Sequence, residues 1–119
     1  MNDFVKVTTT EDGIDVVLDI EHGDVMAIGE KMSEINEEAY MNGYNWEAFL
    51  NYYLEENAPE ILEDMDTDPE AGMYVAYFEA SPGNEEKAKK LGEMIVHLME
   101  NEEEIYQIVR EHGEDIEWD

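Results

Sequence analysis

The stretch FVKVTTTEDGIDVVLDI, residues 4–20, holds two arms rich in β-branched residues on either side of an Asp-Gly pair. In the second arm, Ile14, Val16 and Leu18 occupy every second position, which is the spacing of a strand with one buried face. A glycine at the junction supplies the positive φ that a tight hairpin turn favours. The stretch therefore predicts an N-terminal β-hairpin.

Downstream of the hairpin, the apolar residues change to helical spacing. Over residues 24–40 they lie three or four positions apart, which predicts a helix with Asp24 as its N-cap. The Asn-Gly pair at 42–43 breaks this helix. Asn45 is the predicted cap of a second helix that ends near Pro59, with a short helical turn after it.

Strand and helix patterns alternate in the second half of the chain. The turn-rich residues 64–72 can hold a short strand, and residues 73–78, MYVAYF, are apolar on both faces, which predicts a central strand. Residues 85–99 and 102–112 return to helical spacing, Gly113 ends the last helix, and the acidic tail is expected to fray. This order predicts an α+β fold: an antiparallel sheet with an N-terminal β-hairpin, a central apolar strand and about four helices packed on the sheet.

Negative charge is the dominant feature of the composition. The chain has 33 Asp and Glu against six Lys and Arg, a formal net charge of −27. Such a field repels nucleic acid and anionic membranes, so neither is an expected partner, and it attracts basic proteins. Residues 21–70 hold fifteen acidic residues and one base, Lys31. Adaptation to high salt and plain solubility are the alternative explanations, but eight Met, seven Tyr and several Ile indicate an ordinary core with acid added outside.

Length and targeting signals place the chain among ordinary cytoplasmic domains. Its 119 residues fit one domain, residues 1–119. The absence of cysteine excludes disulfides and thiolate metal sites. The N-terminus has no basic segment followed by an apolar run, and no apolar stretch approaches the length of a membrane span. We therefore expect a cytoplasmic protein.

The histidines give little support for catalysis. No two of them have a metal-ligand spacing such as HxxxH, and the phosphate-binding motifs GxxxxGK[ST] and GxGxxG are missing from the sequence. We therefore expect no enzyme activity and no cofactor. The three histidines are His22, His97 and His112.

One acidic segment has part of a calcium-binding pattern. Asp64, Asp66 and Asp68 match the first three ligand positions of an EF-hand loop. Pro69 then occupies the position of the turn glycine, and Val75 occupies that of the bidentate glutamate. The sequence therefore predicts no specific metal site here.

Acidic and aromatic residues between positions 34 and 64 form the predicted partner surface. Interface hot spots favour Tyr and Trp inside a polar rim, so an exposed Tyr44, Tyr52 or Trp118 would anchor a partner. A solvated acidic face and aromatic core packing are the alternative explanations. The predicted partner-binding residues are Glu34, Glu37, Glu38, Tyr44, Tyr52, Glu55, Glu56, Glu60, Glu63 and Asp64.

Two short segments carry a family resemblance. Residues 43–47, GYNWE, open the second helix, and residues 68–73, DPEAGM, form a turn that enters an aromatic strand. This pattern resembles the bacterial immunity protein 51 family, whose members accompany polymorphic or contact-dependent toxins, although Asn45 stands where that pattern has Asp. The resemblance spans residues 40–100. It implies a protein that binds and blocks a cognate toxin, frequently a nuclease.

Charge and resemblance together favour one hypothesis. It is an immunity protein that binds a cognate basic toxin, expected to be a nuclease, and covers the toxin's substrate surface. The alternative is an acidic nucleic-acid mimic that inhibits a restriction enzyme or another nucleic-acid enzyme. An enzyme or a metal buffer is the least favoured class.

Overall fold

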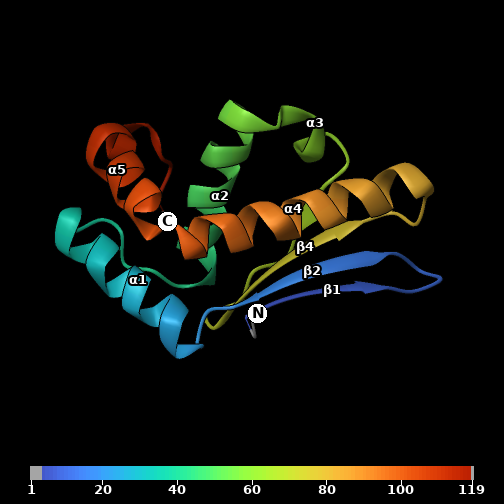
Figure 1. Ribbon diagram of the computed structural model, residues 1–119, viewed down its shortest axis with the longest axis horizontal. Helices are drawn as coiled ribbons and strands as arrows, with labels where there is room; N and C mark the ends of the chain where they lie inside the picture. The colour runs from blue at the N-terminus through green and yellow to red at the C-terminus, as the bar shows by residue number, and fades with distance from the viewer. Residues whose placement is uncertain (1–3, 119) are drawn as a thin grey trace.

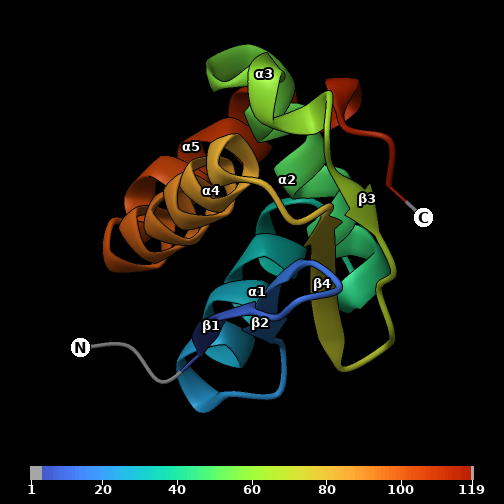
Figure 2. The same ribbon diagram turned by 90° about the vertical axis from the view of Figure 1, so that its right-hand side faces the viewer.

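The computed structural model describes residues 4–118, in which a four-stranded antiparallel sheet supports five α-helices. The strands are β1 (Val5–Thr9), β2 (Ile14–Asp19), β3 (Asp66–Thr67) and β4 (Met73–Phe78). They lie in the order β1-β2-β4-β3, so β2 and β4 are the inner strands (Figures 1 and 2). The predicted hairpin, the central strand and the α+β class are all confirmed.

The helices follow the predicted order, with α3 as the short turn expected after the second helix. They are α1 (Gly23–Ile35), α2 (Gly43–Asn57), α3 (Pro59–Leu62), α4 (Pro82–Glu100) and α5 (Glu102–His112), followed by a 3₁₀ turn at Gly113–Asp115. In Figure 1, α4 lies along the sheet, α2 rises from it, and α1 and α5 lie together at one end.

The core lies between the sheet and the helices on one of its faces (Figures 1 and 2). Helix α4 contacts β1, β2 and β4, and α2 contacts β4. Ile14, Val16 and Leu18 of β2 are buried under these helices, as the alternating pattern predicts. On the other sheet face, Val75 of β4 is shielded by its cross-strand neighbour Val17. Strand β4 is therefore apolar on both faces because it is an inner strand.

Helix α1 begins and ends differently from its prediction. Its N-cap is His22, whose Nδ1 accepts a hydrogen bond from the Asp24 N–H at 3.2 Å. Asp24 therefore lies in the first turn, where a carboxylate is still favourable near the positive end of the helix dipole. The helix ends at Ile35. Ala39, which was predicted to be part of the helix, lies in the following loop and is buried in the core.

Helix α2 also begins earlier than predicted. Asn42 is its N-cap, and the Asn42 side chain accepts a hydrogen bond from the Asn45 N–H at 2.9 Å. Asn45 is buried instead, and its side-chain amide donates to the Tyr40 carbonyl at 2.7 Å. Asn42 is the residue whose side chain reaches the first free N–H groups of the helix.

The hairpin glycine does not have its predicted role. Gly13 has no positive φ, and the loop closes with a hydrogen bond from the Thr10 N–H to the Gly13 carbonyl at 2.8 Å. A Cβ on Gly13 would lie 2.8 Å from the Phe78 carbonyl oxygen of β4. The glycine is therefore required for close approach of two backbones, not for a left-handed turn.

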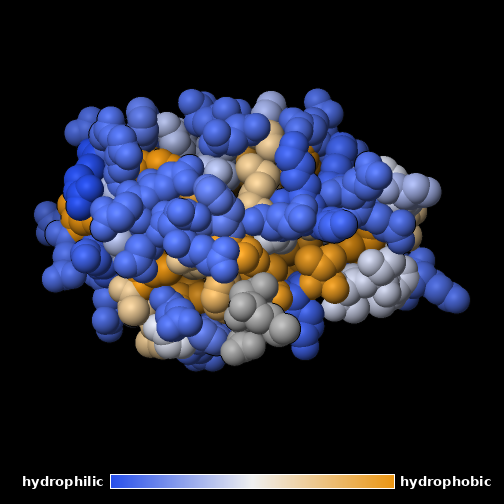
Figure 3. Space-filling view, viewed as in Figure 1, coloured by the Kyte–Doolittle hydropathy of each residue, from blue (hydrophilic) through white to orange (hydrophobic). Residues whose placement is uncertain are grey.

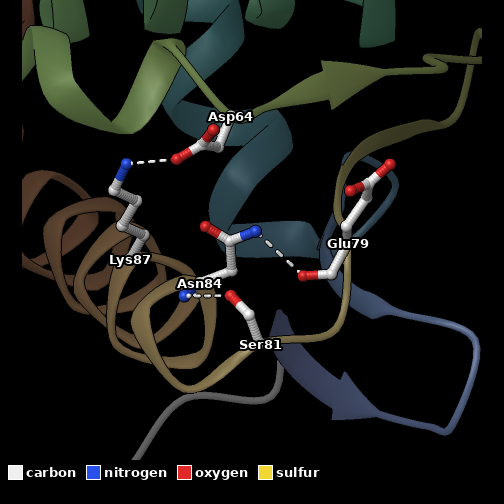
Figure 4. Close-up of polar contacts among 5 residues, drawn as sticks. All are labelled: Asp64, Glu79, Ser81, Asn84 and Lys87. Atoms are coloured by element: carbon white, nitrogen blue, oxygen red, sulfur yellow. Dashed lines mark hydrogen bonds and ion pairs between the residues drawn. The ribbon is translucent and has the colours of Figure 1, made fainter.

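The start of α4 is fixed by local polar contacts (Figure 4). Ser81 caps the helix by accepting a hydrogen bond from the Asn84 N–H at 3.1 Å. The Asn84 side chain donates to the Glu79 carbonyl at 2.9 Å. One turn further on, Lys87 Nζ lies 2.5 Å from Asp64 Oδ2 and joins α4 to the segment after α3.

Candidate functional site

A hollow of about 380 Å³ opens beside α2. Its wall on α2 consists of residues three or four positions apart, which therefore share one side of the helix. Three residues of the C-terminal segment, Asp115, Glu117 and Trp118, form a second wall. The residues of the α2 wall are Tyr44, Glu47, Ala48, Asn51, Tyr52 and Glu55.

The C-terminal wall is held in place by packing, which corrects the prediction of a frayed tail. Ile116 is buried in the core, and the Trp118 indole N–H donates a hydrogen bond to the Gly113 carbonyl at 3.0 Å. A Cβ on Gly113 would lie 2.6 Å from the Asn36 side-chain nitrogen, so this turn fits closely against the end of α1. The tail is structured as far as Trp118, and Asp119 lies outside the described residues.

Neighbouring elements fix the side chains of the hollow. Thr67 of β3 donates a hydrogen bond from its hydroxyl to Glu47 Oε2. The ring of Tyr52 lies 5.8 Å from the ring of His112, centroid to centroid, and His112 Nδ1 lies 3.6 Å from Asp115 Oδ2. The two walls therefore adjoin each other through contacts between α2, α5 and the C-terminal segment.

The hollow is strongly negative. Among its lining residues, Glu47, Glu55, Asp115 and Glu117 are carboxylates, and none is Lys, Arg or His. The pKa of Tyr52 is raised mainly by desolvation of its hydroxyl. The negative charges of Glu56 and Asp115 raise it further. Tyr52 therefore keeps its hydroxyl proton at neutral pH and adds a neutral aromatic ring beside the carboxylates.

Three of the predicted partner-binding residues, Tyr44, Tyr52 and Glu55, lie together in this hollow. Glu56 follows on the same helix and is close enough to act on the Tyr52 hydroxyl. Trp118, the third predicted aromatic anchor, lines the same hollow as Tyr44 and Tyr52. The structure thus brings the three aromatic candidates to one place.

The other predicted residues lie elsewhere, and two of them have basic partners within the chain. Glu60 Oε1 lies 3.2 Å from Lys90 Nζ, and Asp64 pairs with Lys87 (Figure 4). The pKa of Glu60 is lowered mainly by a hydrogen bond from its own backbone N–H. The hydrogen bond from the Lys90 ammonium lowers it further. These pairs weaken the negative field around α3. Exposed residues at the end of α1, in the loop after it and after α3 complete the set: Glu34, Glu37, Glu38 and Glu63.

Several residues of the hollow are absent from the predicted set. Glu47 and Asn51 could have been found from their spacing to Tyr44 and Tyr52 on one helix face. The indication in the sequence was weaker for Asp115 and Glu117. These acids alternate with two apolar residues, Ile116 and Trp118, which suggests that the segment packs against the core.

The histidines lie at three separate places. His22 caps α1, His97 bonds Glu104 of α5 at 3.0 Å, and His112 contacts Tyr52. Residues 4–118 contain no group of three or more His, Asp or Glu side chains arranged to hold a metal ion. Asp64 is paired with Lys87 and Asp66 is part of β3, so the partial EF-hand pattern does not form a loop.

Within the described part of the chain, no helix combines the length and the apolar character needed to cross a bilayer.

Fold and site together define a small, strongly acidic α+β protein with a recess lined by carboxylates and aromatic rings. The sequence model of the family Immunity protein 51 matches residues 5–114, and the chain therefore belongs to that family. Membership indicates toxin immunity in general and a cognate toxin as partner, in a family that is generally non-enzymatic. No curated protein and no solved structure gave a match.

Proposed function

We propose that the chain neutralises its cognate toxin by stoichiometric binding, and that the hollow beside α2 receives a basic side chain of that toxin. The observation that supports this proposal is the combination of four carboxylates with Tyr44, Tyr52 and Trp118 in one recess. Carboxylates attract a cation, and aromatic faces add cation–π attraction when the cation is partly desolvated. The recess is therefore complementary to a positively charged group with a flat, weakly hydrated surface.

Arginine fits this description better than lysine. Its planar guanidinium stacks on an aromatic ring and donates two parallel hydrogen bonds to one carboxylate. Glu55 comes from α2 and Asp115 from the C-terminal segment, and Tyr52 lies on the same wall as Glu55. A guanidinium in the hollow would therefore have a carboxylate acceptor from each wall and a ring beside it.

The remaining charge supports the choice of a basic nuclease as the toxin. An enzyme that cleaves nucleic acid presents a positive surface to its substrate, and a chain of net charge −27 is complementary to such a surface. Long-range attraction of this kind raises association rates at low salt. In this proposal the bound immunity protein covers the substrate surface in the cytoplasm of the producing cell. Membership of an immunity family favours a toxin over a restriction enzyme as the target.

Charge-removing variants of the hollow test its role. The double variant Glu55→Gln with Asp115→Asn removes one carboxylate from each wall, and Glu85→Gln with Glu86→Gln removes the same charge from exposed sites on α4. With the toxin encoded beside this gene, calorimetry should show Kd raised about tenfold or more by the first and little changed by the second. Equal effects of the two double variants would exclude the hollow as the binding site.

Competition with substrate tests the blocking mechanism separately. If the immunity protein covers the substrate surface, nucleic acid bound to a catalytically inactive toxin should be displaced as the immunity protein is added. Fluorescence anisotropy of a labelled oligonucleotide measures this displacement. A stable ternary complex would contradict substrate-surface blocking while leaving toxin binding intact.

A further inference from the structure

A second recess, of about 250 Å³, lies between α1, the loop after it and the first turn of α2. We call it the Trp46 pocket, because Trp46 of α2 is part of its lining, which is mostly apolar. A protein cavity of about 150 Å³ is enough to bind benzene. The Trp46 pocket is therefore large enough for one aromatic ring.

Hydrogen bonds within the chain hold the walls of this pocket in place. The Ser33 hydroxyl donates to the Ala39 carbonyl at 2.6 Å, which ties α1 to the loop after it. The side-chain amide of Asn45 donates to the Tyr40 carbonyl at 2.7 Å, which ties the same loop to α2. The pocket is therefore formed by contacts that do not require a ligand.

The pocket lining includes a buried donor that is not satisfied. Trp46 is fully buried, and among residues 4–118 its indole N–H has no hydrogen-bond partner. An unpaired buried donor is costly, so nearly all such groups in proteins have an acceptor. The indole N–H of Trp118, by contrast, bonds the Gly113 carbonyl. Trp46 therefore has a hydrogen bond to offer to an acceptor in the pocket.

The charge of possible ligands excludes two classes of side chain. Lysine and arginine carry donors only, so neither can accept a hydrogen bond from an indole. Carboxylates accept, but the pocket's described lining includes Glu30 and no Lys, Arg or His, and the chain has a net charge of −27. This field repels anions. Neutral hydroxyls and amides remain as acceptors.

The apolar walls favour a phenol among these neutral acceptors. An amide would bring two further donors into a largely apolar space, at a cost in desolvation. The small side chains of serine and threonine would leave most of the volume unfilled. A phenol ring fills it, and the sulfurs of Met26 and Met41 in the lining are favourable neighbours of an aromatic ring.

The mouth of the pocket is accessible to a partner. Met26 and Tyr40 belong to the lining and are 51% and 74% exposed. Large exposed residues of this kind are uncommon on this chain, and hydrophilic side chains predominate on the face shown in Figure 3. Interface hot spots combine aromatic and apolar groups inside a polar rim. The mouth therefore has the character of a protein interface.

We propose that the Trp46 pocket binds a tyrosine side chain of the toxin, with the Trp46 indole N–H donating to the tyrosine hydroxyl oxygen. The identity of the partner rests on the proposed function, whereas the preference for a phenol does not. Tyr44 of the hollow and Trp46 both belong to the first turn of α2, so the two sites adjoin the beginning of one helix. The hollow takes a cation, and the Trp46 pocket takes a neutral group.

Two small molecules test the chemistry of the pocket without a toxin. p-Cresol is the analogue of a tyrosine side chain, and toluene lacks only the hydroxyl. The chain has two tryptophans, so an isotope-labelled sample gives two indole N–H signals in a nuclear magnetic resonance spectrum. p-Cresol should move the Trp46 signal downfield, leave the Trp118 signal in place and bind about 3–10-fold more tightly than toluene.

Three results would overturn the proposal. The first is equal affinity for p-cresol and toluene, and the second is the lack of a saturable shift at Trp46. The third is a long-lived water bonded to the Trp46 indole that p-cresol does not displace, since a buried water can accept the same hydrogen bond.

Variants of the lining test the location. Met26→Ala shortens one wall and keeps a strong helix former on α1. Met94→Ala is the matched control, because Met94 lies on α4, which is not among the elements that line the pocket. The Kd of p-cresol should rise about threefold or more for the first variant and stay unchanged for the second. Equal effects would contradict the assignment.

Trp46→Phe tests the hydrogen bond itself. This change removes the donor and keeps an aromatic ring, so it should abolish the preference for p-cresol over toluene while circular dichroism shows a folded protein. A preference that survives in Trp46→Phe would overturn the proposed hydrogen bond. If this variant fails to fold, the pair Met26→Ala and Met94→Ala decides.

The toxin encoded beside this gene separates this inference from the proposed function. On toxin binding the Trp46 signal should shift, and Met26→Ala should raise the toxin Kd about tenfold relative to Met94→Ala. If the toxin binds and neither change occurs, this inference fails and the proposed function stands. If no toxin binds, the proposed function fails together with the identity of the partner, and the p-cresol measurements decide the chemistry of the pocket.

Discussion

The indole N–H of Trp118 donates a hydrogen bond to the backbone carbonyl of Gly113 at 3.0 Å, which closes the C-terminal segment into a loop at the end of α5. The two acidic residues of the hollow's second wall, Asp115 and Glu117, lie within this loop. One side-chain hydrogen bond and the burial of Ile116 therefore position half of the hollow.

Trp118→Phe keeps an aromatic ring and removes the donor. A single hydrogen bond of this kind contributes about 0.5–1.5 kcal/mol, so the free energy of unfolding should fall by no more than that. The local effect should be larger, since the loop loses a main attachment. Hydrogen exchange at residues 115–118 should accelerate, and toxin affinity should fall with it. Unchanged exchange in this loop would show that the indole does not position the wall.

Gly43→Ala should be strongly destabilising. A Cβ at Gly43 would lie 1.7 Å from the Glu70 carbonyl oxygen and 2.4 Å from that of Met73, and both are backbone atoms. To relieve this overlap, α2 must move away from the turn that leads into β4, which costs about 1–3 kcal/mol or more in stability. Gly83→Ala is the matched control, because nothing lies within 4 Å of its Cβ position. Urea denaturation should show a loss for the first and no loss for the second. Equal stabilities would contradict the close approach.

Local periodicity accounts for the parts of the fold that were predictable. The alternation of Ile14, Val16 and Leu18 and the three-to-four spacing in the helices reflect burial on one face, which each segment encodes by itself. The first residues of α1 and α2 were misplaced because neighbouring polar residues compete to cap the same N–H groups. His22 and Asn42 prevail through side-chain geometry that spacing does not specify.

The proximity of the site residues was predictable only within the α2 wall. Tyr44, Tyr52 and Glu55 belong to a single helix face, so their proximity follows from the helical repeat. Asp115 and Glu117 reach them through tertiary packing of a segment far along the chain. No local pattern encodes that contact. Predictions from charge density alone also included residues such as Glu60, which the fold pairs with a lysine.

Alkaline pH should destabilise the fold through Tyr74. Its side chain is buried, and this burial, followed by the charge of Glu47, raises its pKa well above the ordinary value. The folded state therefore holds the hydroxyl proton more tightly than the unfolded state does. The stability from this group is fully present below about pH 10 and is lost as the pH rises above it, by about 1.4 kcal/mol per pH unit.

Tyr74→Phe removes this titration. Urea denaturation between about pH 9 and 11 should show a shallower fall in unfolding free energy for the variant than for the wild type. Tyr40→Phe, a change at a 74% exposed position, controls for loss of a tyrosine hydroxyl. Identical slopes for Tyr74→Phe and the wild type would show that the buried phenol does not govern alkaline stability.

Added NaCl should stabilise the folded monomer. The folded state confines most of the chain's 33 carboxylates with its six bases in a body 41 × 27 × 23 Å across, whereas the unfolded chain separates them. Between about 10 mM and 1 M salt the Debye length falls from about 30 Å to about 3 Å, so repulsion across the body is largely screened. Tm should rise by several degrees in thermal melts of the wild-type chain as NaCl is added over this range. The ion pairs of Lys87 and Lys90 act in the opposite sense, but exposed pairs contribute at most about 1 kcal/mol each. A Tm that falls with salt would therefore mean that attractive pairs outweigh the net repulsion.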